Sequence, residues 1–153
     1  MHPTPATGPI APAPEVLATL DRLDQACKAS PGDITPQIEL WTAAASLDYW
    51  VCINRGTPES PRPYMVAADA GHMLCVYSSA ARAVEGARTN GLVAPGESAP
   101  LLMLPLPGAL DWAMSFGQHG VVGVTIDYPK LGAWCPLPNL ARFRPSNDAP
   151  QGR

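Results

Sequence analysis

Charged side chains are scarce in this chain. Asp, Glu, Lys and Arg make up 15% of its 153 residues, whereas about a quarter is usual for globular domains. The ten Lys and Arg residues are scattered and the net charge is −3. Binding to nucleic acid requires a basic stripe on the protein surface, so the composition argues against that class of partner.

The sequence also lacks a long apolar run. Its most hydrophobic window, Pro100–Leu110, is broken by prolines, and a membrane-spanning helix needs about 20 predominantly apolar residues. The segment Met1–Pro14 has neither Lys nor Arg and no continuous apolar stretch, and a secretory signal needs both features. We therefore expect a cytoplasmic protein with no membrane contact.

Sequence signatures of metal sites and of common enzymes are missing as well. Cys27, Cys52, Cys75 and Cys135 are each separated by more than twenty residues, whereas structural zinc sites use closely spaced ligand pairs. The chain has no Gly-x-Ser-x-Gly elbow and no glycine-rich loop that opens a helix. We expect no metal ion, no cofactor and, in the cytoplasm, reduced thiols.

The patterns that are present predict an α+β or α/β fold, with a mixed sheet of about five strands packed with short helices and preceded by an N-terminal helical segment. Residues 14–144 are expected to form a single α/β domain. The proline-rich residues 1–13 are expected to be a disordered or extended arm, and residues 145–153 a flexible tail.

Apolar spacing and turn residues place the elements along the chain. The expected helices are Pro14–Ser30, Thr35–Leu47 with Thr35 as its cap, a helix capped by Ser78 or Ser79 and ending at Gly91, and Pro107–Gly117. The expected strands are Asp48–Asn54, a hairpin made by Tyr64–Ala68 and His72–Tyr77, then Pro100–Leu106 and Gly120–Ile126. The last two strands and the helix between them predict a right-handed parallel crossover.

His72 and Cys75 are the first candidates for a reactive pair, because a thiol and an imidazole three residues apart suggest a nucleophile with its base. On a strand, however, residues three apart face opposite sides and lie about 10 Å apart. A base must lie within hydrogen-bond reach of its nucleophile. We therefore expect Cys75 to be a core residue and His72 a solvated residue of the hairpin.

Two other groups of residues are candidates for a site. Trp134 lies in a proline-rich segment and, with Arg142 and Arg144, is the candidate for a partner-binding surface, since Trp and Arg are favoured at interfaces. The other interpretation of Trp134 is that it plugs one end of the core. His119, Asp127 and Tyr128 are the alternative site, because ligands of open α/β sheets bind at the carboxyl ends of the parallel strands. Asp127 before "YP" is also typical of a turn.

The stretches "YWVCIN", "PYMVAADAGHMLCVYSS", "APLLMLPLPGALDWAMSFG" and "GVVGVTIDYP" occur in an order that resembles the SseB-type N-terminal domain family. The resemblance covers about residues 47–140. It implies a compact α/β fold and no established enzyme activity, and it provides no active-site residues. "DYP" stands where the family often has Asn-Pro-Gly, and "YSS" replaces an aromatic-Thr-Ser.

These observations together predict a non-enzymatic, protein-binding module of bacterial type, with an accessory, immunity-like or chaperone-like role. The expected partner is another protein or a second copy of the chain. The alternative is a small enzyme or a small-ligand sensor with its site at the carboxyl ends of the parallel strands.

Overall fold

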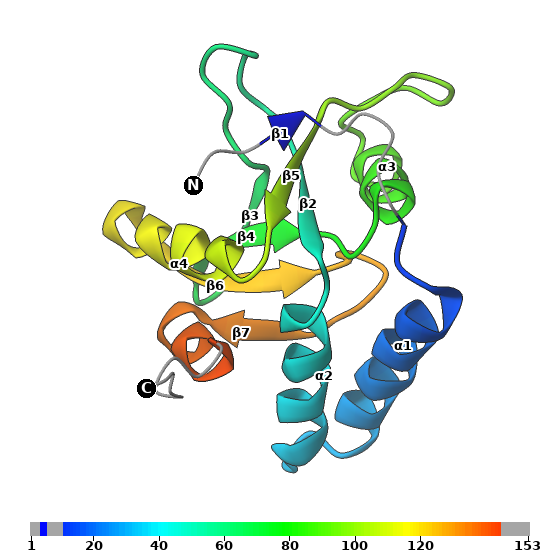
Figure 1. Ribbon diagram of the computed structural model, residues 1–153, viewed down its shortest axis with the longest axis vertical. Coiled ribbons are helices and arrows are strands. Elements are labelled where there is room, and N and C mark those ends of the chain that lie inside the picture. The colour runs from blue at the N-terminus through cyan, green and yellow to red at the C-terminus, as the bar shows by residue number, and fades with distance from the viewer. Residues whose placement is uncertain (1–3, 6–10, 145–153) are drawn as a thin grey trace, which may run out of the picture.

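The computed structural model describes residues 4–5 and 11–144 (Figure 1). Its helices are α1 (Pro14–Ala29), α2 (Thr35–Ala45), α3 (Ala80–Thr89) and α4 (Gly108–Met114), with two 3₁₀ helices, η1 (Ser115–His119) and η2 (Leu137–Phe143). Its strands are β1 (Thr4–Pro5), β2 (Tyr49–Ile53), β3 (Met65–Ala68), β4 (Gly71–Val76), β5 (Leu101–Pro105), β6 (Val121–Ile126) and β7 (Trp134–Pro136). The predicted α+β class with an N-terminal helical segment is confirmed.

The predicted arm and tail fall mostly outside the described residues. In the arm, Thr4 and Pro5 form the short strand β1, and Ala11–Ala13 lead into α1. The tail, residues 145–153, lies outside the described part of the chain.

The strands form two sheets rather than one. The larger, mixed sheet has the order β3-β4-β6-β7, in which β4 and β6 run parallel, and the smaller sheet has the order β1-β5-β2. The two sheets are joined at two antiparallel bridges. At the first, the Val51 N–H donates to the Tyr77 carbonyl at 2.9 Å and the Tyr77 N–H donates to the Val51 carbonyl at 2.7 Å. The second pairs Asn54, just after β2, with Pro63, just before β3.

The predicted crossover between Pro100–Leu106 and Gly120–Ile126 is wrong. Strand β5 pairs antiparallel with β2, and β6 pairs in parallel with β4 instead. Every residue from Trp50 to Ile53 is buried, and so are the central residues of β5. Two strands that are apolar on both faces bury most surface as neighbours, and this preference prevails over proximity in the sequence.

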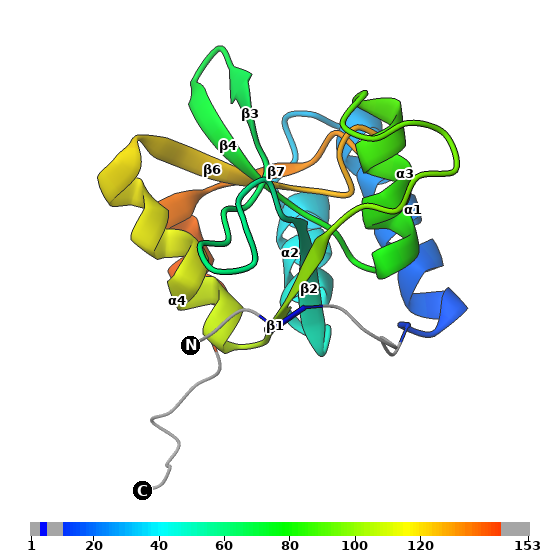
Figure 2. The same ribbon diagram turned by 90° about the horizontal axis from the view of Figure 1, so that it is seen from above.

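One main core lies between the two sheets and the helices. Side chains of α1, α2 and α4 pack on the inner face of the mixed sheet, together with the smaller sheet. Figures 1 and 2 show α4 on one side of the molecule and α1 with α3 on the other. The largest fully buried side chains are Trp50, Tyr77, Leu20, Leu40, Ile53, Leu74, Leu104, Leu110, Ile126, Leu140, Val76 and Val124.

Helix termini follow local chemistry. The Ser79 hydroxyl accepts a hydrogen bond from the Arg82 N–H at 3.1 Å, which confirms the serine cap of α3. Gly91, with φ of 73°, lets the Leu92 N–H reach the Ala87 carbonyl at 2.8 Å and ends that helix as predicted. Thr35 is the first helical residue of α2 rather than its cap, and Asp33 accepts the Thr35 N–H at 3.0 Å.

Gly86 provides a test of packing between α3 and the strand end. A Cβ at this position would lie 2.7 Å from Tyr77 Cε2 and 3.0 Å from the Tyr128 carbonyl oxygen, and Tyr77 is fully buried. We expect Gly86→Ala to lower the free energy of unfolding by about 1–3 kcal/mol through overpacking, despite the better helix propensity of Ala. Urea unfolding followed by Trp fluorescence measures this change.

Gly32→Ala is the matched control, because no other atom lies within 4 Å of the place that its Cβ would take. Equal stabilities of the two variants would contradict the close approach of Tyr77 to α3.

Candidate functional site

Asp127 lies at the centre of a buried polar cluster at the carboxyl ends of the parallel strands. It follows β6 directly, is 1% exposed and has φ of 55°, a left-handed conformation that Asp tolerates better than most residues. Its Oδ1 accepts the Ser78 N–H at 2.8 Å, and its Oδ2 accepts the Ser78 hydroxyl at 2.7 Å. Ser78 comes just after β4, so the carboxylate ties together the ends of two parallel strands.

Arg82 extends this cluster to the N-terminal helix. Its Nη1 donates to Asp127 Oδ2 at 2.9 Å, and its Nη1 and Nη2 each donate to Asp21 of α1 at 2.9 Å. Burial lowers the pKa of the Arg82 guanidinium, but the hydrogen bonds to Asp21 and Asp127 outweigh it, and the net pKa is raised. The guanidinium is therefore a permanent cation that joins α3 to α1 and β6.

The cluster has little capacity for chemistry. Both oxygens of Asp127 already accept hydrogen bonds from Ser78 and Arg82, so the side chain is engaged within the protein. The neighbouring pocket has a volume of about 180 Å³, below the range of about 300–1,000 Å³ that is typical of ligand sites. Its lining residues are Arg82, Glu85, Gly86, Thr89, Asp127, Tyr128, Pro129 and Lys130.

The structure separates the residues of the alternative site. Tyr128 follows Asp127 and lines the same pocket, but His119 ends η1 just before β6 begins. His119 and Asp127 are thus at opposite ends of one strand and do not converge. Arg82 and Asp21 are not among the predicted site residues. Arg82 is 45 residues from Asp127, and Asp21 is 61 residues from Arg82, so no local pattern connects them.

His72 and Cys75 lie on β4 as expected, with His72 exposed and Cys75 fully buried. Burial raises the pKa of the Cys75 thiol to about 11, so the thiol is protonated at neutral pH and is a poor nucleophile.

Among the residues that the structure describes, no three His, Cys, Asp or Glu side chains gather as metal ligands would. Within the same part of the chain, no helix combines the length and the apolar character needed to cross a membrane.

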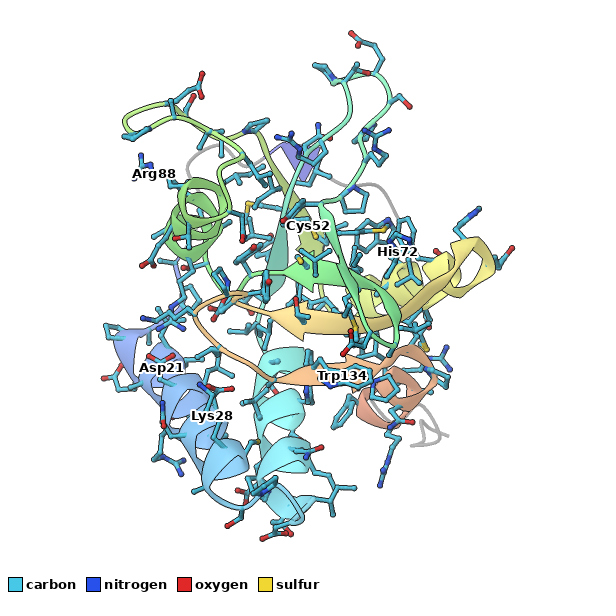
Figure 3. The ribbon with its side chains drawn as sticks, turned by 180° about the vertical axis from the view of Figure 1, so that it is seen from behind. Asp21, Lys28, Cys52, His72, Arg88 and Trp134 are labelled. Atoms are coloured by element: carbon cyan, nitrogen blue, oxygen red, sulfur yellow. The ribbon has the colours of Figure 1, made fainter. Side chains whose placement is uncertain are left out.

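The outer face of the mixed sheet is the second candidate. Seen from behind, strands β4, β6 and β7 carry no helix across them, and Trp134 lies on β7 (Figure 3). This face forms a groove of about 450 Å³, which we call the outer groove. It is lined by Val66, Ala67, Ala68, Asp69, Ala70, Met73, Thr125, Tyr128, Pro129, Leu131, Gly132, Ala133 and Trp134.

Trp134 is held in a defined position although it is 42% exposed. A Cβ on Gly123 would lie 2.7 Å from Trp134 Cε3 and 2.9 Å from Met73 Sδ, so the glycine is what lets the indole lie on the sheet. The preceding loop is anchored as well, because the Gly132 N–H donates to the buried Asp24 of α1 at 3.0 Å. The indole is therefore a supported, solvent-facing platform.

Two further polar side chains, Asp24 and Thr125, lie near Trp134 and the outer groove. The Lys28 ammonium lies 3.0 Å from Asp24 Oδ2, as an ion pair rather than a well-aligned hydrogen bond. Thr125 is 7% exposed and lines the outer groove, and its hydroxyl has only the weak thiol of Cys75 beside it. A buried hydroxyl without a strong partner is uncommon, and this one is shielded from solvent next to the Cys75 thiol.

Arg142 and Arg144 do not join Trp134. Both line another pocket, of about 490 Å³, near the end of α2 and the start of α4, and Trp134 is not part of its lining. Arg144 Nε donates to Asp111 Oδ1 at 2.8 Å. The three predicted partner-binding residues thus fall on two separate surfaces.

Comparison of the chain with family models, with curated proteins and with solved structures gives no match.

Asp127→Asn tests whether the polar cluster stabilises the fold. The amide keeps the shape and tolerates the left-handed backbone but removes the charge that Arg82 and Ser78 bind. We expect a loss of about 2–3 kcal/mol in unfolding free energy. Asp21→Asn should cost about 1 kcal/mol or less, because the Asp21 side chain is 40% exposed.

Asp48→Asn is the control for this pair, because Asp48 is exposed and its carboxylate accepts no hydrogen bond within the described residues. A loss at Asp127 no larger than the loss at Asp48 would contradict the structural role of the cluster.

Thiol reactivity tests the burial of the cysteines. Cys27 is partly exposed, whereas Cys52, Cys75 and Cys135 are buried. With Ellman's reagent we expect one fast-reacting thiol in the native protein, abolished by Cys27→Ser, and four after unfolding.

Burial raises the pKa of the Cys75 and Cys135 thiols from 9.0 to about 11. The contribution of these protonated thiols to the free energy of unfolding is therefore complete below pH 9 and is lost as the pH rises towards 11. Rapid native labelling of Cys75 would contradict the assignment.

Proposed function

We propose that this protein is a non-enzymatic protein-binding module and that its partner docks in the outer groove. The observation that carries the proposal is the exposed, supported indole of Trp134 on the outer face of the mixed sheet. Helix α3 covers this face only near Cys75 and Tyr77, where Ala83 and Ala87 pack. Trp is among the residues that most often dominate binding energy at protein interfaces. Trp41 and Trp50, by contrast, are 3% and 0% exposed and belong to the core.

The composition of the outer groove supports a protein partner. Its walls are mostly apolar and small, from Val66 and the alanines of the β3 hairpin, and Asp69 is its one charged lining residue. An apolar centre with few polar groups and a polar rim is the usual anatomy of a protein interface.

The alternative function, a small enzyme or ligand sensor at the carboxyl ends of the parallel strands, has less support. Its pocket is small, and the Asp127 carboxylate and the Arg82 guanidinium bind each other. His119 lies at the far end of β6. The bacterial origin, the cytoplasmic location and the accessory, immunity-like or chaperone-like role remain predictions, as does the resemblance to SseB-type domains.

Affinity capture with a matched pair of variants tests the proposal. Trp134→Ala removes the platform. Ile34→Ala removes the other large hydrophobic side chain that is exposed among the described residues; it is 57% exposed and lies between α1 and α2. We expect a protein captured by the wild type and by Ile34→Ala to be lost with Trp134→Ala. With that protein purified, Trp134→Ala should raise the dissociation constant about tenfold or more, as loss of a hot-spot side chain does.

Two results would count against the proposal. One is the absence of any partner that distinguishes the two variants. The other is binding that Ile34→Ala weakens as much as Trp134→Ala does.

A further inference from the structure

Strands β2 and β4 share one backbone bridge and separate on both sides of it. Val51 and Tyr77 exchange two hydrogen bonds at this bridge. Hydrogen-bonded pairs of an antiparallel ladder recur every second residue, so Ile53 and Cys75 would form the next pair on one side. The backbone of Tyr64 fills the space between them instead. Its N–H donates to the Ile53 carbonyl at 2.9 Å, and its carbonyl accepts the Cys75 N–H at 3.1 Å.

On the other side of the bridge no described residue takes the corresponding place. Tyr49 and Ser79 would form the next pair there, but they share no hydrogen bond. Within the described residues, the Tyr49 carbonyl and the Ser79 N–H have no hydrogen-bond partner. The Ser78 N–H is turned away, because it donates to the Asp127 carboxylate. Ser79 is buried, and buried backbone groups rarely lack a partner, so this space needs an occupant with both an N–H and a carbonyl.

The space is a pocket of about 380 Å³, which we call the β2–α3 pocket and which Tyr49 and Ser79 both line. Its volume falls within the range that is typical of ligand sites. Val51 and Met103 lie opposite each other on β2 and β5 and give it an apolar wall. Asp48 is the one charged residue among the described residues that line it, which disfavours an anionic ligand. Residues of α1, α2 and α3 surround it, so it suits a small molecule better than a protein surface.

We propose that the β2–α3 pocket binds a short peptide, of which one residue with an apolar side chain fills the space between Tyr49 and Ser79. The bound residue repeats the role of Tyr64: its N–H donates to the Tyr49 carbonyl, and its carbonyl accepts the Ser79 N–H. The side chain of Tyr64 packs against the cluster that contains Val51, so the side chain of the bound residue lies on the same face, against Val51 and Met103. Pairing of an extended peptide with unpaired backbone groups of a sheet is a recurring mode of recognition.

The inference goes beyond the proposed function and does not depend on it. The β2–α3 pocket and the outer groove share no lining residue. Trp134→Ala should therefore leave peptide binding in the β2–α3 pocket unchanged, and failure of either proposal leaves the other standing.

A capped leucine, N-acetylleucine N-methylamide, is the probe that tests the chemistry of the pocket in the full chain. We expect it to shift, in a saturable manner, the amide NMR signals of Ser79 and of Trp50, whose nitrogen is bonded to the Tyr49 carbonyl carbon. The analogue methylated on the leucine nitrogen has no N–H for the Tyr49 carbonyl and should bind about tenfold more weakly. The glycine analogue lacks the apolar side chain and should also bind about tenfold more weakly.

A matched pair of threonine variants tests the location of the site. Thr19 and Thr42 are helix residues whose hydroxyls each donate to the carbonyl four residues earlier, at 2.9 and 2.7 Å. Thr19 lines the β2–α3 pocket and Thr42 does not. Thr19→Trp places a large side chain in the pocket and should raise the dissociation constant of the leucine probe about tenfold or more. Thr42→Trp should leave it unchanged, and circular dichroism checks that both variants are folded.

Four results would overturn the proposal. Three concern the probe: no saturable shift of the Ser79 signal, equal affinity for the analogue methylated on nitrogen, or equal affinity of the Thr19→Trp and Thr42→Trp variants. The fourth concerns the source of the ligand. A captured protein that is lost with Thr19→Trp and kept with Thr42→Trp would show that a protein segment, rather than a short peptide, occupies the pocket.

Discussion

The buried carboxylate of Asp127 is the interaction on which the arrangement of the domain depends. It binds the backbone and the hydroxyl of Ser78 and the guanidinium of Arg82, and Arg82 in turn binds Asp21. Through these bonds one side chain fixes the ends of β4 and β6, the first turn of α3 and the middle of α1. A buried charge is costly unless it is paired, so none of these elements can move away without leaving an uncompensated ion.

This cluster is the reason why we propose a binding site away from the carboxyl ends of the parallel strands, where open α/β sheets usually bind their ligands. The carboxyl ends of the parallel strands are occupied by the protein's own ion pairs, and the polar groups there are already bonded. The outer face of the same sheet is built in the opposite way, with an exposed indole, small apolar side chains and one hydroxyl without a strong partner. The buried ion pairs that stabilise the fold lie at one end of the sheet, and the proposed contact surface lies on its outer face.

Local features were predictable from the sequence, whereas long-range pairing was not. The first helix, the hairpin, the serine cap of α3 and the glycine at its end each depend on neighbouring residues, and all were confirmed. The pairing of β5 with β2 was missed because sequence neighbours were preferred, although both strands are apolar on both faces.

The polar cluster was missed because its members are far apart in sequence. One local signal was available for a related residue: Asp24 lies four residues after Leu20 on the apolar face of α1, and a carboxylate in that position implies a buried partner. It bonds to Gly132 and helps to position the loop before Trp134. For Trp134 the sequence left two interpretations open, a contact surface or a plug at one end of the core, and the structure shows the side chain 42% exposed. Arg142 and Arg144 lie on a different surface, which residue type alone does not reveal.

Hydrogen exchange by mass spectrometry, measured with and without a captured partner, tests the central claim most directly. If the outer face of the mixed sheet is the contact surface, protection increases around Trp134–Pro136 with the partner, and Ser78–Arg82 does not change. Protection confined to Ser78–Arg82 and to the segment after Asp127 would contradict the account and return the site to the carboxyl ends of the parallel strands.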